Sequence, residues 1–313
     1  MEVSNGVESS KKDPQPEATW HKVLDKRWLL LVILIASFLA KAGTRCALVG
    51  ESDYWRSGYG FYYRMADDYL RENEIYLSSH GEKYYAFRPP VYPLLIAGVC
   101  RLSGHSPFAF IVIQALISTI TVAMVYFIAM WIAGRRAGLL SAALFACYPY
   151  AFLHDTQLQE TGLYACLSTS AIACILLALE KKKRWPFFLS GLLLGIAVLT
   201  RISHLLGAGM IGLLVLWLLR REKRQAVQLA GAMTLGALLV LSPWLIRNKL
   251  KTGHLALTSE SGFALARAHN EYTFQYYPWR SIDLGWKDFH NQMDGRQREE
   301  IDSLRSDEFA LGR

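Results

Sequence analysis

Residues 108–136 read FAFIVIQALISTITVAMVYFIAMWIAGRR, and this stretch decides the fold class of the chain. Its apolar part, residues 108–133, is longer than the roughly 20 residues with which a helix crosses about 30 Å of hydrocarbon. No charged side chain interrupts it before Arg135 and Arg136. The stretch therefore predicts a membrane-spanning helix that ends at two arginines.

The composition of the whole chain indicates that this helix is one of several. The 313 residues are 52% hydrophobic and only 19% charged, which lies off the usual balance of a soluble domain. Further apolar runs lie at residues 28–50, 139–153, 163–179, 185–200, 205–219 and 226–246. We therefore expect an all-α integral membrane protein, a polytopic helix bundle with about seven transmembrane helices.

Basic residues mark one side of this membrane. Lysines and arginines precede the first apolar run and follow the second, fourth and sixth, whereas the boundaries between them hold acidic residues or a single arginine. Because Lys and Arg collect on the cytoplasmic side, we predict a cytoplasmic N-terminus. The net charge of +8 is then a determinant of topology, and we expect no nucleic acid as a partner.

This topology divides the chain into three parts. Residues 1–20 are predicted to be a disordered cytoplasmic leader, because they are rich in Ser, Pro, Glu and Lys. Residues 21–248 form the transmembrane domain, which includes an outer loop at residues 51–107. Residues 249–313 are predicted to be a polar tail on the outer face.

The outer loop 51–107 is rich in aromatic residues and contains two predicted interfacial helices. The aromatic rings are expected either in a belt at the lipid headgroups or in walls that contact a sugar or a lipid. Helical spacing of apolar residues within 62–70 predicts a short surface helix. Residues 91–102 are apolar but too few to span the bilayer, so we expect a helix that lies in the interface or re-enters it.

The sequence Arg88-Pro89-Pro90 stands directly before that apolar run. Proline in the first turn of a helix loses no hydrogen bond, because the first amides have no intrahelical partner. The residue before a proline is held extended, which places Arg88 outside the helix at its positive end. A guanidinium beside free helix amides suits a phosphate, and an anchor to lipid headgroups is the alternative.

From about residue 62 to residue 248 the chain resembles the GT-C membrane glycosyltransferases that use a polyprenyl-phosphate sugar. These include protein O-mannosyltransferases, the aminoarabinose transferases of lipid A and a galacturonosyltransferase-like group. The resemblance rests on the order of RPPVYPLLIAGVCRLSG from Arg88, SPFAFIVIQALISTITVAMVYFIAMWIAGRRAG after it, QETGLY at Gln159, GLLLGIAVLTR ending at Arg201 and SPWLIRN ending at Asn248.

The resemblance implies a fold, a reaction and a location. The fold is a GT-C bundle, and the donor is a sugar on a polyprenyl phosphate. The acceptor is a hydroxyl of a lipid, a glycan or a protein, and the reaction occurs on the outer face of a membrane, in our interpretation the bacterial plasma membrane. Relatives continue with further membrane helices, so we expect this chain to be a fragment or a short form.

The resemblance also assigns roles to individual residues. Arg88, Arg201 and Arg247 match basic positions expected near the donor phosphate, and Glu160 matches an acidic position at the outer start of the fourth span. Tyr62, Tyr85 and Glu82 are expected to line the substrate, with Glu82 near an acidic or metal-contacting position of some relatives. Some relatives bind a divalent metal ion, but we assign no metal site here.

The catalytic base is left open by the sequence. Relatives have Asp four residues before the Tyr of a Tyr-x-x-x-Ala pattern, and alignment on Tyr62 and Ala66 places Gly58 there. Asp53 in a longer loop is the preferred replacement. Asp67 or Asp68 is the second choice, and an altered activity is the third.

Two other functions remain as alternatives to a glycosyltransferase. A membrane transporter would also place polar residues among paired helices, but the sequence shows no inverted repeat, and its largest polar and aromatic cluster lies in the outer loop. An inactive or truncated family member would explain the missing Asp. The sugar, the acceptor and the carrier lipid are not identified by the sequence.

Overall fold

The computed structural model describes residues 28–48, 54–56, 58–79, 81–181 and 183–268, together with residues 289, 291, 292, 295 and 309. The predicted leader at residues 1–20 lies outside the described residues, and so does most of the predicted tail. Asp53, the preferred candidate for the base, is also outside them.

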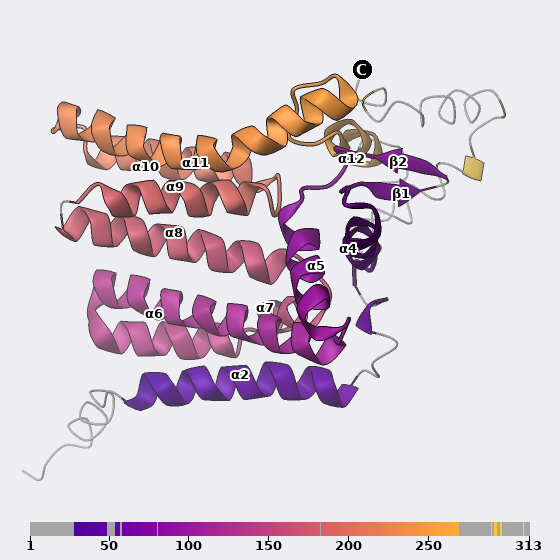
Figure 1. Cartoon of the computed structure of the whole chain (residues 1–313). Coiled ribbons are helices and arrows are strands. Elements are labelled where there is room, and N and C mark those ends of the chain that lie inside the picture. The colour runs from indigo at the N-terminus through magenta and orange to yellow at the C-terminus, as the bar shows by residue number, and fades with distance from the viewer. Residues whose placement is uncertain are drawn as a thin grey trace, which may run out of the picture.

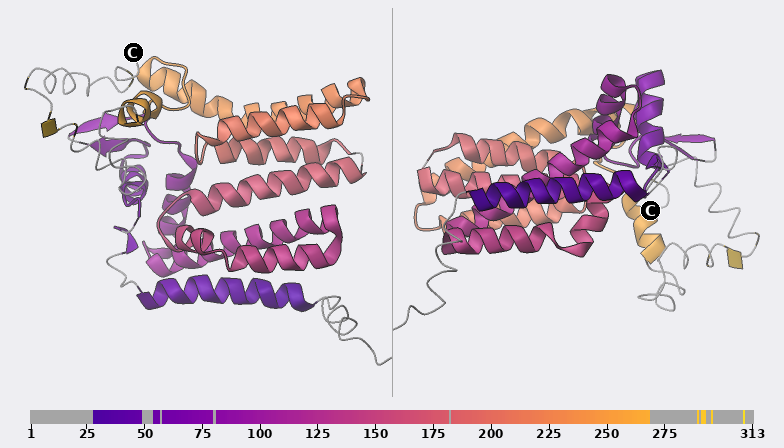
Figure 2. Two further views of the ribbon diagram at one scale, coloured as in Figure 1. Left: turned by 180° about the vertical axis from the view of Figure 1, so that it is seen from behind. Right: turned by 90° about the horizontal axis from the view of Figure 1, so that it is seen from below.

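A bundle of long, side-by-side helices forms the main body (Figure 1). Its members are α2 (Trp28–Leu48), α6 (Pro107–Ala146), α8 (Thr161–Lys181), α9 (Trp185–Val198), α10 (His204–Leu218) and α11 (Lys223–Thr252). Helix α2 packs on α6, α6 on α8, α8 on α9 and α9 on α11, while α10 lies against α11 and α9. The views from behind and from below show the same arrangement (Figure 2). The bundle thus grows largely in chain order.

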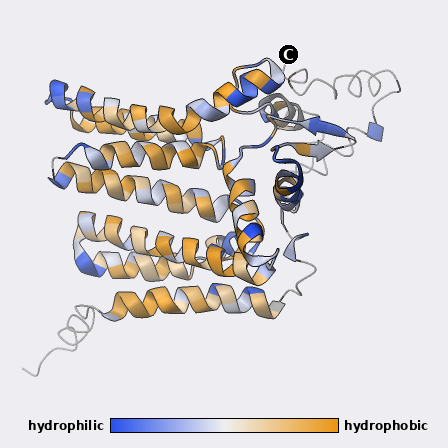
Figure 3. Ribbon diagram, viewed as in Figure 1, coloured by the Kyte–Doolittle hydropathy of each residue, from blue (hydrophilic) through white to orange (hydrophobic). Residues whose placement is uncertain are grey.

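The bundle turns apolar side chains outward, as expected of helices surrounded by lipid. Leu39 on α2 is 61% exposed and Leu206 on α10 is 80% exposed, and apolar residues run along most of each bundle helix (Figure 3). Helices α2, α6, α8 and α11 are long and apolar enough to cross a membrane, whereas α9 and α10 are apolar but shorter. These features support a helical membrane protein, while the predicted seven crossings and their orientation stay predictions.

Helix α6 is a hairpin of two helical arms. Gly134 breaks the helix with φ 83° and ψ 174°, a backbone conformation that costs glycine little and other residues much. The arms pack closely beyond it, because a Cβ on Gly138 would lie 2.9 Å from the carbonyl oxygen of Tyr126. The chain therefore reverses beside Arg135 and Arg136, where the sequence predicted the end of a span.

Shorter elements cover one end of the bundle. We call these elements together the cap, and they are α4 (Phe61–Glu72), β1 (Leu77–Ser79), β2 (Glu82–Tyr84), α5 (Val91–Ser103) and α12 (Glu260–Ala268). Helix α5 runs across the ends of the bundle helices (Figure 1). Helices α4 and α5 occur where the sequence predicted interfacial helices. The antiparallel pair β1–β2, with Leu77 opposite Tyr84, was not anticipated in an all-α prediction.

The core of the cap is aromatic. Tyr54, Tyr62, Tyr92 and Phe110 are each at most 1% exposed, and the rings of Tyr62 and Tyr92 meet edge to face with centroids 5.0 Å apart. Tyr54, Tyr62 and Tyr92 belong to the outer loop, and their burial contradicts the expectation of a headgroup belt for these three rings. They are buried because they fill the space between the cap and the first turns of α6, where a large apolar area is removed from water.

A buried ion pair links α2 to α7 (Pro149–Thr156). The Nζ of Lys41 lies 2.6 Å from Oδ2 of Asp155, and the two side chains are 1% and 7% exposed. The hydroxyl of Ser118 on α6 donates to the same carboxylate oxygen at 2.5 Å and accepts a hydrogen bond from Lys41. Because isolated buried charges are costly, this contact accounts for a lysine inside an apolar helix.

Replacing Lys41 by Met is expected to lower the free energy of unfolding by about 3–5 kcal/mol, because Asp155 would remain as an uncompensated buried charge. Denaturation of the purified protein in mixed micelles measures this change. The double variant Lys41→Met/Asp155→Leu should recover most of the loss. Lys83→Gln is the matched control, since Lys83 pairs with Glu72 at an exposed site, and it should change stability little. Equal effects of Lys41→Met and Lys83→Gln would contradict the assignment.

Candidate functional site

Arg88 lies at the junction of the cap and the bundle. It precedes Pro90, the N-cap of α5, so it stands outside the helix as the sequence predicted. Its guanidinium carbon lies 5.0 Å from the ring centroid of Phe61 and 5.4 Å from that of Phe87. The side chain is 22% exposed and forms an ion pair of 2.7 Å with Glu260. Its Nε is buried without a hydrogen-bond partner in the described chain.

Glu160 and Arg201 form a second acid–base pair at the same end of the bundle. Oε1 of Glu160 lies 3.7 Å from a guanidinium nitrogen of Arg201, and the glutamate side chain is only 7% exposed. Arg201 also donates to the hydroxyl of Thr161 at 3.3 Å. Oε2 of Glu160 is buried and has no hydrogen-bond partner in the described chain. Such an oxygen remains free to accept a hydrogen bond or a proton.

Two backbone hydrogen bonds bring these pairs together. The amide of Val91, three residues after Arg88, donates to the carbonyl of Leu199, two residues before Arg201, at 3.1 Å. The amide of Tyr59 donates to the carbonyl of Leu158, two residues before Glu160, at 2.9 Å. The first bond places the segment of Arg88 beside that of Arg201, and the second places the loop before Tyr62 beside the segment of Glu160.

Tyr62 lies among the charges of both pairs. Burial raises the pKa of its phenol well above the ordinary value. The negative charges of Glu160 and Glu260 raise this pKa further, whereas the positive charges of Arg88 and Arg201 oppose the increase. The Tyr62 phenol therefore stays neutral, and its pKa responds to all four charged groups. We define the candidate site as Arg88, Glu160, Arg201, Glu260 and Tyr62.

An open groove of about 600 Å³ adjoins this site. It is lined by Trp55, Arg56, Phe61, Tyr63, Arg64 and two glycines. Phe61 belongs to both features, because it lines the groove and its ring centroid lies 5.0 Å from the guanidinium carbon of Arg88. A polar ligand in the groove would therefore come close to the charged residues.

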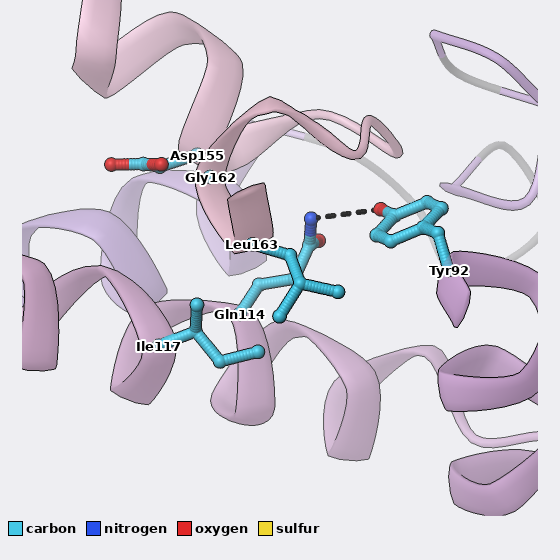
Figure 4. A pocket seen from close by; sticks show the side chains of 6 residues that line it. All are labelled: Tyr92, Gln114, Ile117, Asp155, Gly162 and Leu163. Carbon is cyan, nitrogen blue, oxygen red and sulfur yellow. Dashed lines mark hydrogen bonds between the residues drawn. The ribbon is translucent and has the colours of Figure 1, made fainter. Parts of the chain in front are cut away.

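Polar side chains continue from the site into the bundle. Gln114 of α6 donates to the hydroxyl of Tyr92 at 3.1 Å and to the carbonyl of Gln157 at 3.0 Å, and it accepts a hydrogen bond from Tyr54. A cavity of about 10 Å³, room for about one water molecule, lies between Gln114, Tyr92 and Asp155 (Figure 4). These contacts fix the connection from α7 to α8 that carries Glu160.

The other predicted site residues lie further out in the cap. Asp67 pairs with Arg71 one turn away on α4. Burial, followed by the charges of Glu72 and Asp67, raises the pKa of Asp68 above its usual value. Glu82 is exposed on β2.

Arg247 is held by the loop that carries Tyr85. It donates to the backbone carbonyls of Tyr85 and Ile75, and its guanidinium lies 4.6 Å from the ring centroid of Trp244. These bonds fix the end of α11 against the cap.

Gly58, which occupies the position expected for the catalytic Asp, has no room for a side chain. Its φ is +60°, and a Cβ would lie 2.8 Å from the carbonyl oxygen of Leu158. This carbonyl also accepts the hydrogen bond from the amide of Tyr59. Gly58 therefore allows the outer loop to approach the segment before Glu160.

The sequence did not identify two charged residues, Lys41 and Glu260, that form ion pairs in the structure. Lys41 was hidden in an apolar run, although a lysine near the middle of such a run is itself a signal of a buried partner. Glu260 is 172 residues from Arg88 in sequence, and nothing local marks it as a partner. Among the described residues, no three His, Cys, Asp or Glu side chains gather as metal ligands would.

The arrangement combines groups for anion binding and for proton transfer. Guanidinium groups beside helix ends can stabilise negative charge that develops on a phosphate. A buried carboxylate with a free oxygen can accept a proton from a hydroxyl. Both kinds of group lie next to an open groove.

Two comparisons with known proteins bear on this site. The sequence model of a family described as dolichyl-phosphate-mannose-protein mannosyltransferase matches residues 87–246. The match includes Arg88, Glu160 and Arg201 and leaves out Gly58 and Glu260. A search of curated proteins finds no match.

The packing at Gly58 can be tested against a glycine with a similar backbone. Gly58→Ala and Gly81→Ala both place alanine at positive φ, which costs about 1–2 kcal/mol each. Gly81 faces open space, so only Gly58→Ala adds a clash with Leu158. We expect Gly58→Ala to lower the unfolding temperature clearly more than Gly81→Ala in the same detergent. Equal shifts would show that the loop does not depend on this close approach.

Proposed function

The chain belongs to the dolichyl-phosphate-mannose-protein mannosyltransferase family and is a membrane glycosyltransferase; from this premise we propose the following reaction. The protein transfers a sugar from a polyprenyl-phosphate carrier to a hydroxyl of an acceptor, at the extracytoplasmic face. The observation that carries this proposal is the gathering of Arg88, Arg201 and Glu160 around Tyr62 at one end of the bundle.

Arg88 is proposed to bind the phosphate of the donor. Its guanidinium lies close to two aromatic rings and keeps a buried Nε without a partner in the described chain. Arg201 is proposed to assist, because the Val91–Leu199 hydrogen bond joins the segments that carry the two arginines. Arg247 is proposed to support this phosphate site by holding the Tyr85 loop, since it donates to the backbone carbonyls of Tyr85 and Ile75.

Glu160 is proposed to take the proton of the acceptor hydroxyl. The acceptor oxygen then forms a bond to the anomeric carbon, and the bond from that carbon to the phosphate oxygen breaks. The electron pair of the broken bond stays on the leaving lipid phosphate, where Arg88 and Arg201 stabilise the added charge. Asp53 remains the alternative base, and Asp67 and Asp68 are less favoured because they lie on α4 near Arg71.

The groove beside Phe61 is proposed to admit the acceptor. It offers the aromatic rings of Trp55 and Tyr63 together with two arginines, a combination that suits a lipid, glycan or protein with polar and anionic groups. Tyr85 and Glu82 are proposed to line the donor sugar from the neighbouring part of the cap. No observation favours a transporter over this function.

Arg88→Gln is expected to reduce sugar transfer by about 100-fold or more, because a charge that stabilises the leaving phosphate is lost. Transfer from dolichyl-phosphate mannose or undecaprenyl-phosphate mannose is measured in native membranes, with protein levels checked. Arg71→Gln is the matched control, since Arg71 is 74% exposed and pairs with Asp67 one turn away on the same helix. Full transfer by Arg88→Gln would refute the phosphate assignment.

Glu160→Gln is expected to lower kcat by about 100- to 10,000-fold with little change in the KM of the donor, because the amide cannot accept the proton. The same transfer assay at varied donor concentration separates the two constants. Glu72→Gln, which alters a carboxylate of the exposed pair with Lys83, should leave both constants unchanged. A retained kcat would exclude Glu160 and return the role to Asp53, Asp67 or Asp68.

A further inference from the structure

We propose that Glu260 acts as an internal anion, which occupies the phosphate position on Arg88 and is displaced when a prenyl phosphate binds. The inference rests on the proposed function of Arg88 and goes beyond it, because it assigns a role to a residue outside the matched segment. The ligand class is a phosphate ester on an isoprenoid chain.

The geometry of the pair is that of an occupied anion site. The carboxylate of Glu260 contacts one terminal nitrogen of Arg88 through both oxygens, at 2.7 and 2.8 Å. The rings of Phe61 and Phe87 also lie within 5.4 Å of the same guanidinium. A phosphate oxygen requires the same donors at the same distances. The carboxylate and a phosphate therefore compete for Arg88.

The backbone before α12 holds Glu260 in this position. The hydroxyl of Thr258 donates to the carbonyl of Phe87 at 2.8 Å, and the amide of Ser259 donates to the carbonyl of Ala86 at 3.0 Å. The amide of Glu260 in turn donates to the Thr258 hydroxyl at 3.0 Å. The segment that carries Glu260 is thus docked on the two residues that precede Arg88, and this docking places the Glu260 carboxylate at the Arg88 guanidinium.

The charges of donor and product give this competition a function. The donor is a phosphodiester with a charge of −1, whereas the product is a phosphomonoester with about −1.5 to −2 at pH 7. Arg88 alone would therefore hold the product more strongly than the donor. The displaced carboxylate of Glu260 stays near Arg88, because its segment is docked on Ala86 and Phe87. It offsets this difference, since its repulsion of the bound ligand grows with the ligand's charge. Glu260 accordingly favours release of the lipid phosphate.

Binding of two short probes tests the inference without a transfer reaction. Farnesyl phosphate carries the product's charge, and its methyl ester carries the donor's charge. Binding of each to the purified full chain in detergent is measured by calorimetry. We expect Glu260→Gln to bind farnesyl phosphate about tenfold more tightly than the wild type, and the gain should be smaller for the methyl ester. Glu260→Asp, which keeps the charge, should stay closer to the wild type.

Further variants separate a specific effect from a structural one. Glu74→Gln is the matched control. Glu74 pairs with Lys251 of α11 at 2.5 Å, a contact that does not involve Arg88. This variant should therefore leave the affinity for both probes unchanged. Thr258→Val should tighten binding in the same direction by loosening the docked segment, and it replaces Glu260→Gln if that variant fails to fold. The gain must disappear in Arg88→Gln/Glu260→Gln.

The outcomes distinguish this inference from the proposed function. Suppose that Arg88→Gln weakens the binding of farnesyl phosphate. The role of Glu260 is then overturned if folded Glu260→Gln, or Thr258→Val in its place, binds farnesyl phosphate no more tightly than the wild type. Equal binding by wild type and Arg88→Gln overturns the phosphate site itself, and the proposed function with it.

Discussion

Peptide groups find no hydrogen-bonding partner in hydrocarbon, and this constraint shapes the whole molecule. The apolar runs are helical because a helix satisfies its backbone internally. Chain reversal is confined to places where the helix can end, as at Gly134 beside two arginines. Lys41, a charged residue within an apolar helix, is paired with Asp155 and Ser118. Irregular and polar segments are therefore displaced to the ends of the bundle, and the candidate site lies at one of these ends.

At that end, backbone hydrogen bonds between distant segments position the charged side chains. The Val91–Leu199 bond sets the segment of Arg88 beside that of Arg201, and the Tyr59–Leu158 bond sets the loop before Tyr62 beside the segment of Glu160. Small residues permit this approach, since a side chain at Gly58 would meet the Leu158 carbonyl and a Cβ on Gly162 would lie 2.5 Å from Oδ1 of Asp155. Asp155 of the buried ion pair is therefore packed against Gly162, two residues after Glu160, so the ion pair and the site adjoin the same short connection between α7 and α8.

The charges of the site are arranged in pairs. Arg88 faces Glu260, and Arg201 faces Glu160. Neutralised guanidiniums cost less to keep at the edge of a bilayer than free ones, and each pair leaves one atom, Nε of Arg88 or Oε2 of Glu160, without a partner in the described chain. The proposed lipid-phosphate donor needs cations at the site, and this pairing keeps Arg88 and Arg201 there, with side chains that are 22% and 42% exposed.

The sequence by itself determined the helices of the bundle, the reversal near Arg135 and Arg136, and the position of Arg88 before α5. These features follow from run length, proline geometry and local charge, which are properties of neighbouring residues. Only the tertiary structure decided that Lys41 meets Asp155, that Glu260 meets Arg88 and that Gly58 is packed against Leu158. These contacts join residues far apart in the chain, and they depend on how the helices pack and how the cap seats on them, which no local pattern encodes.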